Sequence, residues 1–236
     1  SDIDLDNFKF KNSLNLKDFL PKIGKYLIFK NQKIKFEYIK NNFTITGKGD
    51  VFLQNEIDKI EYKINKKDDE IKFNSKLKIL KNSLKIDLLN YKKKADSELE
   101  LIFVGTNILK EKLIFTEISL KEKNNIISIK NLNFSNDNKI NDLGNVIIDF
   151  IDTEDLKNNL KLTKKDKDYL VSGKSFNINK IIDELLESEN KSELKFFNKD
   201  FKIIFDVERI YLNKDNIIND LKGFLSLTKN GISELI

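Results

Sequence analysis

The sequence lacks several residue types on which common enzyme and metal sites depend. Its 236 residues include no Cys, His, Trp or Met, and only one Pro. Without His and Cys, the usual zinc ligands, a haem His ligand, a disulfide and the Ser-His-Asp or Cys-His catalytic groups are all excluded. Because Met is absent even at position 1, we expect the chain to be an excerpt of a longer protein.

Patterns that would identify a membrane span or a ligand loop are missing as well. No hydrophobic run exceeds four residues, which excludes a membrane-spanning helix or signal peptide within this segment. Gly47-Lys48-Gly49 lacks the spacing of a phosphate-binding loop, and the acidic pairs lack the spacing of an EF-hand. Two carboxylates would suffice for a glycosidase, but the chain has no Trp to form a sugar platform. We therefore predict a non-enzymatic protein with no cofactor and no metal.

Charge is abundant but evenly mixed. The 43 basic residues and 38 acidic residues give a net charge of +5, and all but one of the basic residues are Lys. Nucleic-acid sites favour Arg and clustered positive charge. We interpret the charges as a solvated surface and predict no nucleic-acid partner.

The residues that are plentiful favour β-structure. The chain has 33 Ile, 18 Phe and 6 Tyr, whereas Ala, the best helix former, occurs once. Apolar residues alternate with polar ones along most of the chain, which is the period of a strand with one face in water. Short polar segments separate the runs, and with only eight Gly, Asn and Asp must supply the special turn conformations. We predict a mainly β fold, an extended antiparallel meander.

The alternation also predicts which side chains share one side of the sheet. We expect the apolar sets to form that side and their polar alternates to face water. The apolar sets are Ile60, Tyr62, Ile64, Ile71, Phe73, Leu77, Ile79, Leu84, Ile86, Leu88, Leu99, Leu101, Phe103, Phe201, Ile203, Phe205 and Val207. The polar alternates are Lys72, Lys76, Lys78, Lys85, Glu98, Glu100 and Lys202.

Two segments show helical spacing, so we expect two short helices that pack on the sheet. The first lies near residues 16–27 and contains Pro21. The second begins at about Ile178, with Asn177 as its N-cap and a buried stripe on one side. The members of this stripe are Ile178, Ile181, Ile182, Leu185 and Leu186. In addition, residues 132–143 and 210–221 share six identities at an offset of 78, which predicts a repeated hairpin.

The last third of the chain resembles a known family. Residues 169–186 read YLVSGKSFNINKIIDELL, and residues 201–227 read FKIIFDVERIYLNKDNIINDLKGFLSL. This order of strand, Gly-Lys-Ser turn, short helix and paired strands resembles the AsmA-like envelope proteins, in particular the large YhdP- and TamB-type members of Gram-negative bacteria. The resemblance covers residues 169–236, and residues 2–167 share only the strand rhythm. We therefore divide the chain into a meander over 1–168 and an AsmA-like strand-helix-strand unit over 169–236 that continues the same sheet.

The resemblance implies a fold, a location and a role. It implies a repeating β-groove, a sheet curled into a long hydrophobic groove, in a periplasmic protein that is attached to the inner membrane through a segment outside this sequence. It also implies transport of phospholipid between the inner and outer membranes and maintenance of the outer membrane. The expected partners are phospholipid or another acyl-chain lipid, together with membranes.

The residues themselves leave two alternatives open. A large apolar sheet face must be buried by closing into a barrel, by stacking as a sandwich, or by forming a trough that holds something apolar. The trough gives the lipid conduit, and the closed forms give a scaffold or protein-binding module of the cell envelope. A charge placed at Leu101 or Phe103 distinguishes them, because it unfolds a closed core but is tolerated in an open trough.

Overall fold

The computed structural model describes residues 1–12, 16–137, 139–187, 200–228 and 231–235. The chain forms two compact units. Unit 1 consists of Ser1–Ile86 and Lys92–Lys123, and unit 2 consists of Asp87–Tyr91 and Asn124–Ile236. The predicted boundary near residue 168 falls inside unit 2, at the turn where Lys165 pairs with Asp168.

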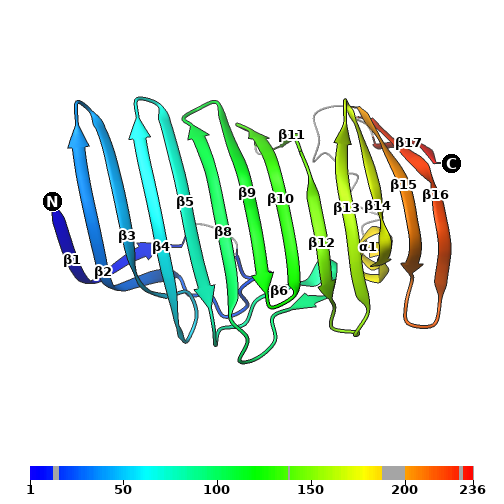
Figure 1. The fold of residues 1–236 in the computed structure, drawn as a ribbon, viewed down its shortest axis with the longest axis horizontal. Helices are drawn as coiled ribbons and strands as arrows, with labels where there is room; N and C mark the ends of the chain where they lie inside the picture. Colours follow the sequence, from blue (N-terminus) through cyan, green and yellow to red (C-terminus); the bar gives the residue numbers. More distant parts are fainter. Residues whose placement is uncertain (13–15, 138, 188–199, 229–230, 236) are drawn as a thin grey trace. The chain divides into compact units, whose positions relative to one another are not determined.

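Unit 1 is an antiparallel sheet whose strands lie side by side in chain order (Figure 1). Its order is β1-β2-β3-β4-β5-β8-β9, and neighbouring strands in this order pair antiparallel. The strands are β1 (Asp2–Lys11), β2 (Tyr26–Ile39), β3 (Asn42–Phe52), β4 (Ile57–Lys67), β5 (Glu70–Ile79), β8 (Leu99–Ile108) and β9 (Lys112–Glu122). Between β5 and β8 lie two-residue strands, β6 (Lys85–Ile86) and β7 (Tyr91–Lys92).

Unit 2 is a second set of strands, with the chain's one described α-helix inserted between two of them. The order is β10-β12-β13-β14-β15-β16-β17, and β11 pairs with β10. The 3-10 helix η1 (Asp87–Leu89) also belongs to this unit. The elements are β10 (Asn125–Ser135), β11 (Ile140–Asp142), β12 (Val146–Ile151), β13 (Lys157–Lys165), β14 (Asp168–Asn177), α1 (Asn179–Glu187), β15 (Phe201–Tyr211), β16 (Ile217–Thr228) and β17 (Gly231–Leu235).

The prediction of a mainly β and mostly antiparallel fold is confirmed. The prediction that Asn and Asp supply most of the unusual backbone conformations is confirmed as well. Among described non-glycine residues, twelve have a positive φ, and nine of these are Asn or Asp. The two-residue connection between β2 and β3 has φ values of 45° at Lys40 and 65° at Asn41, which matches the twist of a hairpin. In the described residues, the strand order of neither unit closes on itself.

One pair of strands departs from the predicted meander. β14 and β15 are parallel, with Tyr169 opposite Ile203 and Gly173 opposite Val207. The connection between them includes α1, and a parallel pair requires such a crossover because a two-residue turn joins only antiparallel strands. An intervening helix therefore changes the strand direction that a short turn would have imposed.

The second predicted helix is present and the first is not. The side chain Oδ1 of Asn177 accepts a hydrogen bond from the Asn179 backbone N–H at 3.2 Å, as expected of an N-cap. Residues 16–23 form single turns instead, closed by the Leu20 N–H to the Leu16 carbonyl at 2.8 Å, and β2 already begins at Tyr26. Pro21 has no N–H to donate to a helical hydrogen bond, which disfavours a longer helix here. The apolar spacing reflects instead the burial of Leu20 and Ile23 in these turns.

The two similar sequence segments both form antiparallel hairpins. Phe134 pairs with Ile140 in the first, and Ile210 pairs with Ile218 in the second. Each turn is closed by a backbone hydrogen bond over four residues, Ser135 to Lys139 at 2.9 Å and Leu212 to Asn216 at 3.0 Å. Residue 138 lies outside the described residues.

Candidate apolar binding face

The strand register gathers apolar side chains on one side of unit 1, here called the apolar face. Residues directly opposite one another in neighbouring strands share a face, so each cross-strand row can be read from the pairing. The first row, at the open end, is Tyr38, Phe43, Lys66, Ile71, Asn107 and Leu113. The next rows are Phe36, Ile45, Ile64, Phe73, Gly105 and Phe115; then Ile34, Gly47, Tyr62, Ser75, Phe103 and Ile118; then Gly49, Ile60, Leu77, Leu101 and Leu120.

Within the described residues of unit 1, one end of this face is covered. Residues 16–25, 80–86 and 92–97, here called cap 1, pack on the row that contains Val51, Ile79 and Leu99, and these three side chains are 0% exposed. Backbone hydrogen bonds hold the cap, including Lys85 N–H to the Phe19 carbonyl at 3.0 Å. Most side chains of the other rows are only half-buried. The same face therefore has a capped end and an open end.

In the middle of the apolar face, two glycines leave space that aromatic rings of the neighbouring strands occupy. A Cβ at Gly47 would lie 2.2 Å from the ring of Tyr62, and one at Gly105 would lie 2.6 Å from the ring of Phe73. Both rings therefore lie over a glycine of the neighbouring strand. Phe73 also meets Phe115 edge-on at 5.6 Å between ring centroids. The glycines allow the aromatic rings to lie along the sheet where a larger residue would push them outward.

Cap 1 buries ionisable side chains at the closed end. The Asn82 side chain donates to the Asp58 carboxylate at 2.7 Å, and the ammonium of Lys93 donates to the Leu80 carbonyl at 2.6 Å. The carboxylate of Glu122 accepts from the Lys94 backbone N–H at 2.8 Å. Burial raises the pKa of Asp58 and lowers the pKa of Lys93, because each charged form has lost its water. Oδ1 of Asp58 is buried without a hydrogen-bond partner among the described residues.

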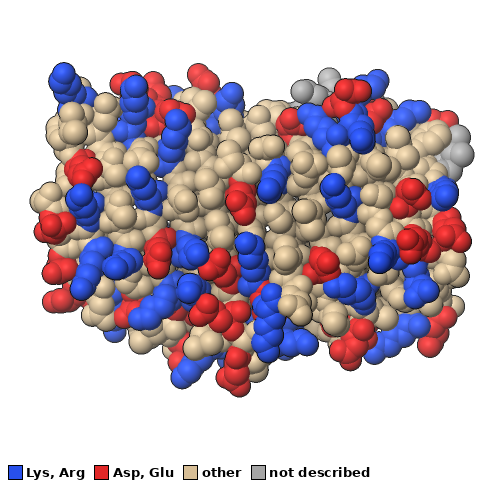
Figure 2. Space-filling model, in the orientation of Figure 1, with Lys and Arg blue, Asp and Glu red and all other residues tan. Residues whose placement is uncertain are grey.

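The opposite, charged face of unit 1 carries the polar alternates. Ion pairs cross this face between Lys76 and Glu100 at 3.0 Å and between Lys78 and Glu98 at 3.4 Å. A shallow hollow of about 540 Å³ lies among its lysines, around Thr46 and Lys63. In Figure 2, Lys and acidic residues are interspersed over the face in view, without a large area of one sign. Such exposed pairs contribute at most about 1 kcal/mol each and mainly keep this face in water.

Unit 2 also covers part of its apolar face. Phe176, Val207 and Ile210 form a buried cluster against which Ile178 and Ile181, next to and within α1, are packed. Together with Leu89 of η1, this helix covers one end of the face, and we call the two elements cap 2. Along β15, Ile203 and Phe205 remain half-buried.

Amides and one carboxylate fasten cap 2. Asp152 accepts hydrogen bonds from the backbone N–H groups of Glu154 and Leu156, both at 2.9 Å. Its other oxygen accepts from the side chains of Asn177 at 2.9 Å and Asn158 at 3.1 Å. Every bond to this carboxylate comes from a neutral donor. The buried Asp152 is thus fully hydrogen-bonded without a cation.

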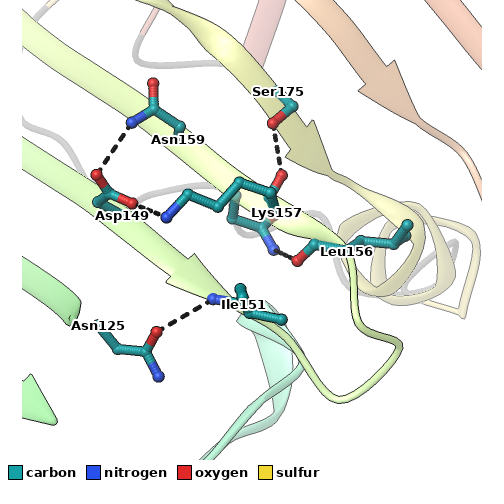
Figure 3. A network of polar contacts seen from close by, with 8 residues as sticks. Asn125, Asp149, Ile151, Leu156, Lys157, Asn159 and Ser175 are labelled. Atoms are coloured by element: carbon teal, nitrogen blue, oxygen red, sulfur yellow. Dashed lines mark hydrogen bonds and ion pairs between the residues drawn. The ribbon is translucent and has the colours of Figure 1, made fainter. Parts of the chain in front are cut away.

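The charged face of unit 2 has its own polar network, which links neighbouring strands (Figure 3). Lys157 pairs with Asp149, which also accepts a hydrogen bond from the Asn159 side chain at 3.2 Å. The Ser175 hydroxyl donates to the Lys157 carbonyl at 2.5 Å. Side-chain contacts join β12 to β13, and the Ser175 hydroxyl joins β14 to the backbone of β13, so this face has a structural role.

The structure brings most of the predicted site residues together within each unit. In unit 1, the register places Ile60, Tyr62, Ile64, Ile71, Phe73, Leu77, Ile79, Leu99, Leu101 and Phe103 on the apolar face. In unit 2, Phe201, Ile203, Phe205 and Val207 alternate along β15. Of the predicted helical stripe, the side chains of Leu185 and Leu186 lie outside those described.

Three predicted residues are not in the sheet. Leu84 is buried in cap 1, Ile86 lies in the two-residue strand β6, and Leu88 lies in η1 with 42% of its surface exposed. Their alternation was not that of a long strand, because the segment between β5 and β8 folds over the end of the sheet. Their polar alternate Lys85 is half-buried there rather than facing water.

The prediction missed the charged member of the open-end row, Lys66. The signal was present, because the alternation Ile60, Tyr62, Ile64 leads directly to Lys66 on the same face. It also missed Gly47 and Gly105, whose role depends on the ring opposite each of them.

Comparisons of the chain with protein-family models, with curated proteins and with solved structures find no match. Within the described residues, no helix is both long and apolar enough to cross a membrane. Those residues also contain no group of three or more acidic side chains placed to hold a metal ion.

Proposed function

We propose that this chain is a non-enzymatic lipid-binding segment that shelters phospholipid acyl chains on its apolar faces. The supporting observation is the apolar face of unit 1, whose middle rows are mainly apolar across neighbouring strands and which the described residues of this unit cover at one end. Monomeric proteins rarely leave so large an apolar surface without an occupant. Binding lipid requires a continuous apolar path and no reactive side chain.

The energetics of an acyl chain favour such an occupant. Moving a 16-carbon chain out of water is favourable by about 12 kcal/mol, at about 0.8 kcal/mol per CH₂ group. A face lined with Ile, Leu and Phe provides such an apolar environment. Because the strand order does not close on itself, the face has room for an acyl chain. In this proposal the sheet curls around the lipid to complete a groove.

The biological role follows from the sequence resemblance and is part of the same proposal. An AsmA-like protein would carry phospholipid between the inner and outer membranes of a Gram-negative envelope, attached to the inner membrane from the periplasm. The alternative is a closed scaffold or protein-binding module of the envelope, in which the apolar faces are buried by protein.

The test is to purify the chain from cells, extract it and identify bound lipid by mass spectrometry. The proposal expects stoichiometric phospholipid. A protein that is free of lipid and does not take it up from vesicles would overturn the proposal and favour the scaffold. Strongly salt-dependent oligonucleotide binding would instead indicate a nucleic-acid partner.

A further inference from the structure

Lys66 occupies an unusual position on the apolar face of unit 1. Its register partners are Phe43 on β3 and Ile71 on β5, so it stands between two apolar side chains. It is half-buried, and no ion pair joins it to any described residue. Glu70, which is four residues further along the chain, lies on the charged face and pairs with Lys72 at 3.4 Å.

The rest of the open-end row can also contact a polar group. Asn107 follows Ile71 in this row and presents an amide on the apolar face. Tyr38, at the β2 side of the row, donates its hydroxyl to Asn41 at 2.9 Å and is 60% exposed. The open end is therefore amphipathic, with one cation, whereas the rows between it and cap 1 are mainly apolar.

The closed end is covered instead of open. Asp58 and Glu122 lie in the row beneath cap 1 and are each 1% exposed, and the ammonium of Lys93 is close to both. A phosphate placed there would meet buried carboxylates and the covering segments of cap 1. An anionic head group is therefore better accommodated beside Lys66, in the open-end row.

The spacing fits an amphiphile laid along the strands. Lys66 and Asp58 are eight residues apart on β4, which corresponds to about 26 Å at 3.3 Å per residue. The acyl layer of one membrane leaflet is about 15 Å thick. The middle rows are therefore long enough for acyl chains while the head group remains at the open end.

We propose that unit 1 binds an anionic phospholipid in a single orientation, with the phosphate at Lys66 and the acyl chains running along the middle rows toward cap 1. This inference rests on the proposed function and adds the head-group charge and the polarity of the bound lipid. A phosphate at Lys66 forms a charge-assisted hydrogen bond and gives this half-buried cation its counterion.

Unit 2 provides an internal contrast. Lys164 lies in the corresponding type of position, since it pairs in register with Tyr169 and continues the alternation Leu160, Leu162. Its ammonium already has a carboxylate partner, Asp142, at 2.5 Å. Because Asp142 already neutralises Lys164, a lipid phosphate would gain little by binding there. We therefore expect unit 1, and not unit 2, to prefer an anionic head group.

The experiment compares uptake of phosphatidylglycerol and phosphatidylcholine with identical acyl chains from vesicles, by the intact chain and by Lys66→Gln. The parent is expected to prefer phosphatidylglycerol by about tenfold, and Lys66→Gln to lose that preference while still binding both lipids. Lys63→Gln, on the charged face of the same strand, and Lys164→Gln are the matched controls, and both should retain the preference.

Orientation is read separately with spin-labelled phosphatidylglycerol and methyl resonances of Ile. A nitroxide near the head group should broaden Ile71 and Ile64, and one at the end of the acyl chain should broaden Ile60. If the parent takes up neither lipid, the proposed function itself fails. If lipid binds but Lys66→Gln keeps the preference, or the labels give the reverse order, the proposed function stands and this inference is overturned.

Discussion

The two units cover one end of their apolar faces with side chains of different chemistry. Cap 1 buries the charged side chains of Asp58, Lys93 and Glu122, and one oxygen of Asp58 has no described partner. Cap 2 rests on Asp152, whose carboxylate accepts four hydrogen bonds from neutral amides. Burying a charge costs free energy that only complete hydrogen bonding or pairing offsets. Cap 1 should therefore be the less stable of the two.

The difference also bears on function. A cap that carries unsatisfied charge opens at lower cost than one whose polar groups are all paired. Unit 1, with the weaker cap, also has the open-end lysine that lacks a described ion pair, whereas the lysine of unit 2 is neutralised by Asp142. Under the proposed function, we expect lipid exchange to depend mainly on unit 1.

The largest expected effect is on thermal stability, and it should differ between a charge placed in the capped part of the apolar face and one placed in the open part. Leu99 is 0% exposed under cap 1, and Leu101 is half-buried on the same face of β8. Leu99→Asp should cost several kcal/mol and unfold unit 1, because the charge cannot reach water. Leu101→Asp and Phe103→Lys should melt close to the parent and lose bound lipid. Thermal melting and lipid occupancy are measured on the same samples.

Equal loss of stability in Leu99→Asp and Leu101→Asp, with no lipid in the parent, would mean that the whole face is a closed core. The distinction between a capped and an open end would then be wrong, and the scaffold alternative would be favoured.

The next effect concerns the amide network of cap 2. Asn158 is 0% exposed, donates to Asp152 and the Leu156 carbonyl, and accepts from the Asn177 N–H at 2.8 Å. Asn158→Ala leaves buried partners unsatisfied and should lower the free energy of unfolding by about 3 kcal/mol in urea titrations. Asn159→Ala, which removes one bond on the charged face, is the control and should cost less than about 1 kcal/mol. Similar losses in the two variants would show that cap 2 does not depend on this network.

A smaller effect, of opposite sign, is expected in cap 1. Asp58→Asn keeps the shape and an acceptor for Asn82 while leaving Lys93 with Glu122, so the cluster becomes neutral. We expect a gain of about 1 kcal/mol in unfolding free energy at neutral pH, measured by denaturant titration. Glu122→Gln should instead be destabilising, because Glu122 has the largest effect among the carboxylates near Lys93, ahead of Asp58 and Asp96. A loss of stability in Asp58→Asn would refute the contrast between the caps.

The smallest expected effect is the pH dependence of the stability gained in Asp58→Asn. Burial raises the pKa of Asp58 in the folded protein above its ordinary value of 3.8, so ionisation of Asp58 destabilises the fold as pH rises through the raised value. Well below pH 3.8 the carboxyl group is protonated in both the folded and the unfolded state, and Asp58→Asn should then have little effect. The difference between variant and parent should grow from acid to neutral pH. A difference that is independent of pH would exclude ionisation as its cause.

The sequence predicted part of the candidate site because strand alternation is a local property. The side-chain period of two assigns Ile60, Tyr62 and Ile64 to one face whatever their neighbours are. The alternation failed at Leu84 and Leu88, where the chain leaves the sheet. It also gave no warning that residues 16–23 would form turns, since the same apolar spacing arises when Leu20 and Ile23 cover a sheet end.

The sequence by itself determined the β class, the two faces of each long strand and the use of Asn and Asp in turns, because these depend on residues close together in the chain. Only the tertiary structure decided the parallel pairing of β14 with β15, which end of each apolar face is capped, and the placement of Gly47 beneath Tyr62. It likewise decided that Lys66 stands between Phe43 and Ile71 while Lys164 is paired with Asp142. These features depend on contacts between residues distant in the chain, and a pattern of alternating residues does not specify which strand will lie opposite.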